Sequence, residues 1–408
     1  MNLLLIILIS LLIIFSFIYF SLLRNNKSTN IKELYAEGLD MLVSGKRQGA
    51  YKNFKEIVDK DSNNIKAYIR LGQVLREGGK VTKAIKMHKN LLLRKNITNY
   101  ELIELHKNLA LDYYKIQNYN QSIKECKKIL KHERNNEWSI NQLILLNKKN
   151  KDWFQATEFL KTYFEISGKI DNDKLSLFKI QQSKKLIHEQ QFDEARLILD
   201  KALNLKQDSA PIYYFMAKSY SEESSIEYNK AVELQSNGSE SLTGSNEYNE
   251  HIEQAKKILS KAIPFWVHFT EINPNQSWLI LPSLKDALFV LNRYSELENI
   301  LVELNNQNSD NIEILVSLAD YYYHKEEINK ALDVINSYED NKEENTILIN
   351  LMKVKLELQK SNNDKLSNEV DKIFNLLIKD KRYQFLNDES TSSDMKWLLE
   401  DDDFRIEN

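Results

Sequence analysis

Histidine is the side chain that most often binds transition metals in proteins, and this sequence contains seven histidines. They stand at positions 88, 106, 132, 188, 251, 268 and 324. None of them forms an HExxH motif or another paired-ligand spacing, so the sequence predicts no zinc site. His88 follows the apolar register of a helix, which favours a packed imidazole over a metal ligand.

The other residues that could do chemistry also favour structural roles. Cys126 is the only cysteine, which excludes an intrachain disulfide and a cysteine-rich metal site, and its register predicts a core position. Gly78-Gly79 is typical of a turn between helices, and no serine stands in a strained nucleophile-elbow motif. The acidic run Glu400 to Asp403 lacks EF-hand spacing and predicts a solvated tail. We therefore expect no enzymatic activity, no bound metal and no cofactor.

The composition indicates that these residues lie in a helical fold and not in a β fold. The chain has 408 residues, 42% of them hydrophobic, with only 9 glycines and 4 prolines. So little glycine and proline disfavours a turn-rich β architecture. The 56 Lys and Arg residues are balanced by 59 Asp and Glu residues, which gives a net charge of −3. Nucleic acid is not expected as the main partner, because phosphate binding needs a basic surplus.

The N-terminal segment predicts a membrane anchor. Residues 3–23 form an uncharged apolar run, whose helical length of roughly 30 Å matches a bilayer core. A cleaved signal peptide is the alternative, but it would need a basic start and small residues before a cleavage site. Arg24, Lys27 and Lys32 follow the run, so the positive-inside rule places the rest of the chain in the cytoplasm.

Small residues recur with the spacing of a helix-pair repeat. They stand twelve apart in pairs, one midway along a first helix and one early in a second: Gly38 and Ala50, Gly72 and Ala84, Ala110 and Ser122, and Ala319 and Ala331. The first two pairs are offset by one period of 34 residues, the period of the tetratricopeptide repeat (TPR). The sequence therefore predicts an all-α fold, a TPR solenoid of stacked helix pairs behind a single transmembrane helix.

The repeat pattern and the composition together predict five segments. An anchor (1–24) precedes a front TPR array (31–220), a flexible Ser/Asn/Gly/Glu-rich insertion (221–250), a back array with a helical cap (251–380) and an acidic tail (381–408).

The inner surface of a TPR solenoid usually binds a partner segment, and repeat geometry selects the first-helix residues that line it. In the second and third repeats these residues are Gln73, Arg76, Lys107, Tyr114 and Lys115. Arginine can pair with carboxylates, and tyrosine adds apolar contact area at low entropic cost. An ordinary solvated helix face is the alternative for each of them.

Three segments resemble the lipopolysaccharide assembly protein B family, which consists of bacterial inner-membrane TPR proteins. They are YAEGLDMLVSGK, LGQVLREGGKVTKAIKMHKNLLLRKNIT and LALDYYKIQNY, which follow a lone N-terminal apolar span as in that family. The family ends in a rubredoxin-like ribbon with four metal-binding cysteines. Here Tyr383 and Trp397 keep the family's spacing, by chance or as the remnant of a degenerate ribbon. The four cysteine positions hold Phe385, Asp388, Leu399 and Asp402, so an iron or zinc site of that type is not expected.

The resemblance implies a regulatory adaptor on the cytoplasmic face of the bacterial inner membrane. Such an adaptor presents the committed-step deacetylase of lipid A synthesis to the membrane-bound AAA+ protease FtsH and so sets lipopolysaccharide output. The replaced cysteines leave a second interpretation open, a generic membrane-anchored TPR scaffold for another envelope complex. The sequence also leaves open whether the chain forms a homo-oligomer.

Overall fold

The computed structural model describes residues 30–236, 242–308, 311–339 and 347–360, together with positions 368, 370–374, 377 and 395. The predicted anchor at 3–23 lies outside these residues, as do Phe385, Asp388, Leu399 and Asp402 of the tail. Within the described ranges, no helix is both long and apolar enough to cross a membrane. The same ranges contain helices and no β-strand, which confirms the all-α prediction.

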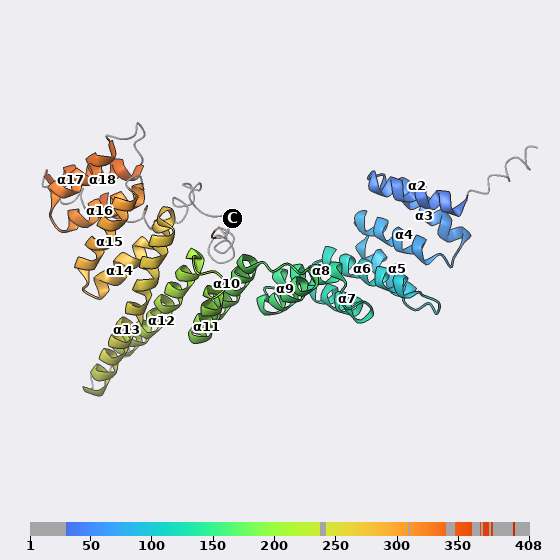
Figure 1. Ribbon diagram of the computed structural model, residues 1–408, viewed down its shortest axis with the longest axis horizontal. Helices are drawn as coiled ribbons and strands as arrows, with labels where there is room; N and C mark the ends of the chain where they lie inside the picture. The colour runs from blue at the N-terminus through green and yellow to red at the C-terminus, as the bar shows by residue number, and fades with distance from the viewer. Residues whose placement is uncertain are drawn as a thin grey trace, which may run out of the picture. The chain divides into compact units, whose positions relative to one another are not determined.

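The chain forms two compact units, which divide at Lys169 and Ile170, a boundary that the sequence pattern does not mark. In the first unit, successive helices form antiparallel pairs (Figure 1). Its helices are α2 (Ile31–Val43), α3 (Arg47–Lys60), α4 (Ile65–Glu77), α5 (Val81–Leu91), α6 (Asn99–Lys115), α7 (Tyr119–His132), α8 (Glu137–Lys149) and α9 (Trp153–Ser167). Each pair also packs on the next, which is the arrangement of a TPR solenoid.

Small residues allow the two helices of each pair to approach closely. A Cβ added to Gly38 of α2 would lie 2.9 Å from the Phe54 ring of α3, and one added to Gly72 of α4 would lie 2.2 Å from His88 Nε2 of α5. Phe54 and His88 are fully buried. The predicted small positions are therefore contact points between helices, at which a larger side chain would collide with the partner helix.

Side chains just before several helices determine where those helices begin. The side chains of Asn30, Asn64 and Asn136 accept hydrogen bonds from backbone amides of the helix that follows each of them, and Thr98 forms a capping box with Glu101. Part of the abundant asparagine of this chain thus has a structural role as helix N-caps.

The second unit contains α10 (Asn172–His188), α11 (Phe192–Leu203), α12 (Ala210–Ser236), α13 (Leu242–Ile272), a short 3-10 helix (Pro274–Leu279), α14 (Leu281–Val290), α15 (Tyr294–Gln307), α16 (Ile312–His324), α17 (Ile328–Glu339) and α18 (Ile347–Lys360). Its largest core joins buried side chains of α12 through α18. Phe374 and Met395, which are fully buried, belong to the same core.

The predicted flexible insertion at 221–250 is wrong for most of that segment. Residues 221–236 continue α12, and residues 242–250 begin α13; residues 237–241 lie outside the described ranges. The two helices run side by side as a long hairpin (Figure 1). The hydroxyl of Ser224 donates to the carbonyl oxygen of Ala255 at 2.7 Å, and His251 Nδ1 lies 2.8 Å from Glu227 Oε2. Pairing between the helices overrides the loop-like composition, which is a purely local signal.

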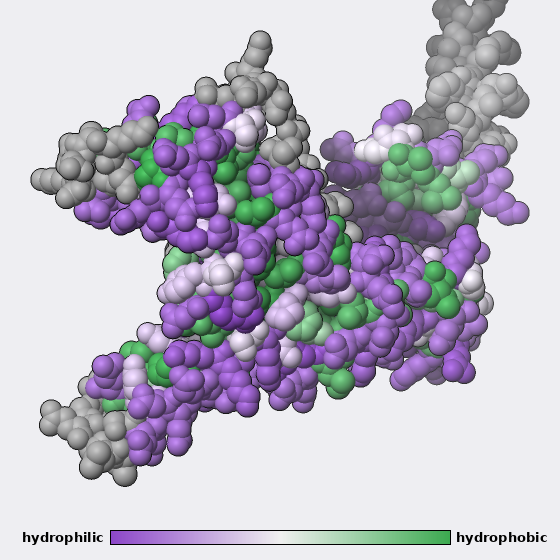
Figure 2. All heavy atoms as spheres, turned by 60° about the vertical axis from the view of Figure 1, so that its left-hand side comes forward, coloured by the Kyte–Doolittle hydropathy of each residue, from purple (hydrophilic) through white to green (hydrophobic). Residues whose placement is uncertain are grey.

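One face of the described residues is mainly hydrophilic (Figure 2). Figure 2 shows hydrophilic residues over most of the visible face, with hydrophobic residues in small separate areas. Scattered exposure of this kind is ordinary for a folded protein. A binding surface must therefore be sought in the arrangement of polar and aromatic side chains.

Candidate protein-binding surface

Two neighbouring helices carry the five residues that repeat geometry selects. Gln73 and Arg76 lie on α4, whereas Lys107, Tyr114 and Lys115 lie on α6. The two helices pack directly against each other, as the first helices of consecutive TPRs do. The structure thus brings the five residues onto one stretch of the first unit.

Arg76 does not lie on the accessible face, which corrects the sequence-based expectation. It is only 9% exposed, and its Nη1 donates to Asp112 Oδ1 at 2.8 Å and to Asn108 Oδ1 at 3.2 Å. A guanidinium group removed from water needs such partners, because burial of an unpaired charge is costly. Arg76 therefore holds α4 against α6, and its replacement would disturb the fold as well as any surface.

His88 completes this buried polar cluster. Its Nδ1 lies 2.6 Å from Asp112 Oδ2, and its Nε2 lies 3.3 Å from the carbonyl oxygen of Ile69. Both His88 and Asp112 are fully buried, which confirms that His88 is a packed imidazole. The sequence pattern did not lead us to Asp112. A carboxylate at a core position of the LALDYYK segment could have indicated a buried ionic pair.

Gln73 and Lys107 belong to a half-exposed polar row. Gln73 accepts from Arg70 Nη1 at 2.9 Å and donates to Glu77 at 3.0 Å. Lys107 Nζ lies 3.3 Å from Glu104 Oε1 and 5.7 Å from the centre of the Trp138 ring. These are weak surface pairs, which a partner can exchange for its own groups at little cost.

Tyr114 and Lys115 stand at the end of α6. Tyr114 is half-buried, and its ring lies 5.8 Å from the ring of Tyr119. Lys115 is exposed. An aromatic ring and an exposed cation at the same helix end can bind a partner by apolar contact and by charge. The use of these residues in binding stays a proposal.

Cys126, the single cysteine, is not available for chemistry at this surface. Cys126 is fully buried, and burial raises the pKa of its thiol to about 12, which makes a thiolate nucleophile inaccessible. Among the residues that the structure describes, no cluster of His, Cys, Asp and Glu has the arrangement of a metal site.

The second unit contains a separate buried ionic cluster around Asp320 of α16. Its carboxylate pairs with Lys285 of α14 and with Lys355 of α18, the latter at 2.6 Å. Lys355 is fully buried and also pairs with Asp371. Burial opposes ionisation of Asp320, but His324, Lys285 and Lys355 outweigh it and hold the pKa of the carboxyl well below its usual range.

Curated relatives were found by sequence comparison, although no family model matches the chain. The chain is 19% identical over 210 residues to lipopolysaccharide assembly protein B of Escherichia coli (strain K12), which covers 52% of this chain and 54% of that protein. It is 22% identical over 303 residues to the protein of the same name from Haemophilus influenzae, which covers 72% of this chain and 68% of the relative. The resemblance to lipopolysaccharide assembly protein B is confirmed. The chain spans about half the length of the Escherichia coli relatives that it matches.

Solved TPR structures are similar at a lower level. The C-terminal part of a TPR protein from Cytophaga hutchinsonii has a TM-score of 0.35 and 11% identity, and the match covers 78% of this chain and 98% of that one. The MamA protein has a TM-score of 0.33 and 16% identity, and the match covers 43% of this chain and 92% of that one.

Proposed function

We propose that this protein is a membrane-anchored TPR adaptor that regulates lipopolysaccharide synthesis by presenting a biosynthetic enzyme to a membrane protease. The relation to lipopolysaccharide assembly protein B is the observation that carries this proposal. The structure supports it with a solenoid that exposes polar and aromatic side chains, because such a scaffold binds other proteins through an extended surface.

The proposed anchor is the apolar run at 3–23, and the proposed partners are the lipid A deacetylase and the FtsH protease. Isolation of the tagged full chain from bacterial membranes, followed by mass spectrometry, tests these partners directly. Recovery of both proteins is expected. Recovery of a different envelope complex, with neither of them, would favour the generic scaffold, the alternative that the replaced cysteine positions Phe385, Asp388, Leu399 and Asp402 keep open.

Truncation of Tyr114 and Lys115 to alanine is expected to weaken client capture at least tenfold, about 1.4 kcal/mol. Tyr114 supplies apolar area and Lys115 an exposed charge at the end of α6, where we expect the client to make contact. The measurement is the concentration dependence of capture by the purified full chain. The matched control replaces Tyr100 and Lys127, which are exposed on the same unit, by alanine and should leave capture unchanged. Equal capture by the folded Tyr114/Lys115 variant would place the client elsewhere.

A reporter enzyme that is active only in the periplasm should stay silent when it is fused after Asn408. The reason is that Arg24, Lys27 and Lys32 beside the apolar run favour retention of the following chain in the cytoplasm. A fluorescent protein that folds in the cytoplasm, fused at the same position, is the control and should be bright. Periplasmic activity of the first fusion would reverse the topology and remove access to a cytoplasmic client.

A further inference from the structure

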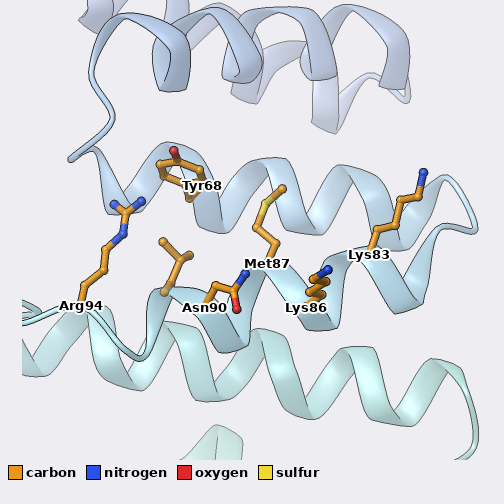
Figure 3. Close-up of a pocket in the computed structure, with 7 residues that line it drawn as sticks. Tyr68, Lys83, Lys86, Met87, Asn90 and Arg94 are labelled. Atoms are coloured by element: carbon orange, nitrogen blue, oxygen red, sulfur yellow. The ribbon is translucent and has the colours of Figure 1, made fainter.

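A pocket on the second repeat is not used by the surface described above. It has a volume of about 420 Å³ and lies along α4 and α5. Figure 3 shows Tyr68 on α4 above a row of side chains from α5 and from the segment that follows it. A volume of this size accommodates several side chains of a bound segment.

The floor of the pocket is apolar and adaptable. Leu91 is almost fully buried, whereas Tyr68 and Met87 are half-buried and keep part of their surface open to the pocket. Methionine adjusts its shape to irregular ligands, and tyrosine offers a ring face to an apolar side chain. Asn90, which is exposed at the same pocket, presents an amide that can pair with a peptide group.

The rim of the pocket is cationic. Lys83 and Lys86 are exposed, and neither has a hydrogen bond or an ion pair with the residues that the structure describes. Arg94 is held in place, because its Nη1 donates to the carbonyl oxygen of Ser62 at 2.8 Å and its guanidinium lies 4.5 Å from the centre of the Tyr68 ring. Two free ammonium groups and a fixed guanidinium thus surround an apolar floor.

The sequence around the pocket is strongly basic in a chain of net charge −3. Residues 78–100 contain no Asp or Glu, but they include Lys80, Lys83, Lys86, Lys89, Arg94 and Lys95. Within this stretch Lys89 is engaged elsewhere, since its ammonium lies 5.7 Å from the centre of the Tyr113 ring on α6. Lys83, Lys86 and Arg94 of this basic stretch line the pocket, and their positive charge would attract an anionic partner.

We propose that this pocket binds an acidic segment of a partner protein, with an apolar side chain on Tyr68, Met87 and Leu91 and flanking carboxylates on Lys83, Lys86 and Arg94. The proposal rests on the adaptor function and adds a second contact for the client. A flat lipid surface fits less well, because it cannot place an apolar group in a recessed pocket without a protruding element. The concave floor and the Asn90 amide suit a peptide instead.

The test measures fluorescence anisotropy of a short labelled peptide of alternating glutamate and leucine, added to the full chain in neutral detergent at low salt. The wild type is expected to bind this peptide and to bind a version with glutamine in place of glutamate at least about tenfold more weakly. The variant K83E/K86E should lose at least about tenfold in affinity, and added salt should weaken binding to the wild type.

A matched control is present on the next repeat. Lys124 and Lys127 of α7 are exposed and have the same three-residue spacing, so K124E/K127E changes the charge equally without touching the pocket. It should retain the wild-type affinity within about twofold, since neither lysine lines the pocket. Circular dichroism of both variants should match that of the wild type.

Three results would overturn the proposal. One is an equal loss of affinity in K83E/K86E and K124E/K127E, and another is equal binding of the glutamate and glutamine peptides. The third is an absence of peptide binding while phosphatidylglycerol added to the detergent is retained less by K83E/K86E than by the wild type. Client capture from membranes is measured separately, so a failed peptide experiment leaves the adaptor function standing, and the reverse also holds.

Discussion

Replacement of Asp320 by alanine is expected to lower the free energy of unfolding of the second unit by about 3–5 kcal/mol. Asp320 is 1% exposed and pairs with Lys285 and with the fully buried Lys355. Its removal leaves the fully buried Lys355 with Asp371 as a remaining carboxylate, and a buried charge that loses one of its partners is strongly destabilising. Urea unfolding of the full chain measures the loss, and hydrogen exchange of peptides from α14 to α18 assigns it to this unit.

The control for this prediction is Glu296 of α15. It pairs with Arg293 at 2.6 Å, but both side chains are more than one third exposed. Truncation of Glu296 to alanine should therefore cost less than about 1 kcal/mol. Equal effects of the two truncations would show that the Asp320 cluster contributes no more than a surface pair.

The Asp320 cluster also determines how the stability of the second unit changes with pH. The folded state holds the pKa of Asp320 below its usual value. The ionised carboxylate therefore stabilises the fold fully at pH values above the pKa of Asp320 in the unfolded chain, which is roughly 4. This stabilisation is lost progressively as the pH falls from there toward the lower pKa of the folded state. The Asp320→Asn variant should lose this part of the acid sensitivity, which unfolding midpoints over an acidic pH series would detect.

Replacement of Gly72 by alanine is expected to destabilise the first unit by about 2 kcal/mol, although alanine favours helices over glycine. The added Cβ would lie 2.2 Å from His88 Nε2. His88 cannot move aside easily, since it is fully buried and lies within hydrogen-bonding distance of both Asp112 and Ile69. The strain must therefore separate α4 from α5. Urea unfolding with hydrogen exchange of peptides from these two helices measures it.

Gly78 provides the matched control for Gly72. It is exposed at the end of α4 with a φ of −83°, a value that alanine adopts freely. Its added Cβ would come no closer than 3.2 Å to another atom. Gly78→Ala should therefore change the free energy of unfolding by less than about 0.5 kcal/mol. If Gly72→Ala were as stable as this control, the close approach of α4 and α5 would not limit the side chain at position 72.

The helix pairs were predictable because their signals are local. Gly72 and His88 lie on consecutive helices of one repeat, and Asn64 caps the helix that directly follows it. Their types and spacing can therefore be recognised within one period of 34 residues. The same logic placed Cys126 in the core, and the structure confirms that it is fully buried.

The burial of Arg76 could not be predicted in this way. Its partner Asp112 is 36 residues away on the first helix of the next repeat. The standard repeat geometry assigns position 76 to the accessible face, and only a specific acceptor opposite it makes burial favourable. Whether the cation at position 76 is exposed or buried therefore depends on contacts with the neighbouring repeat.

The sequence by itself determined the class of fold, the phase of the helix pairs in the first unit and the relation to lipopolysaccharide assembly protein B, since each of these rests on residues close together in the chain. The tertiary structure decided the buried pairs of Arg76 and Asp320, the long hairpin of α12 and α13 and the cationic pocket beside Tyr68. The physical reason is the same for all of them. A charge or a polar segment takes its role from the groups that packing brings against it, and those groups come from other helices.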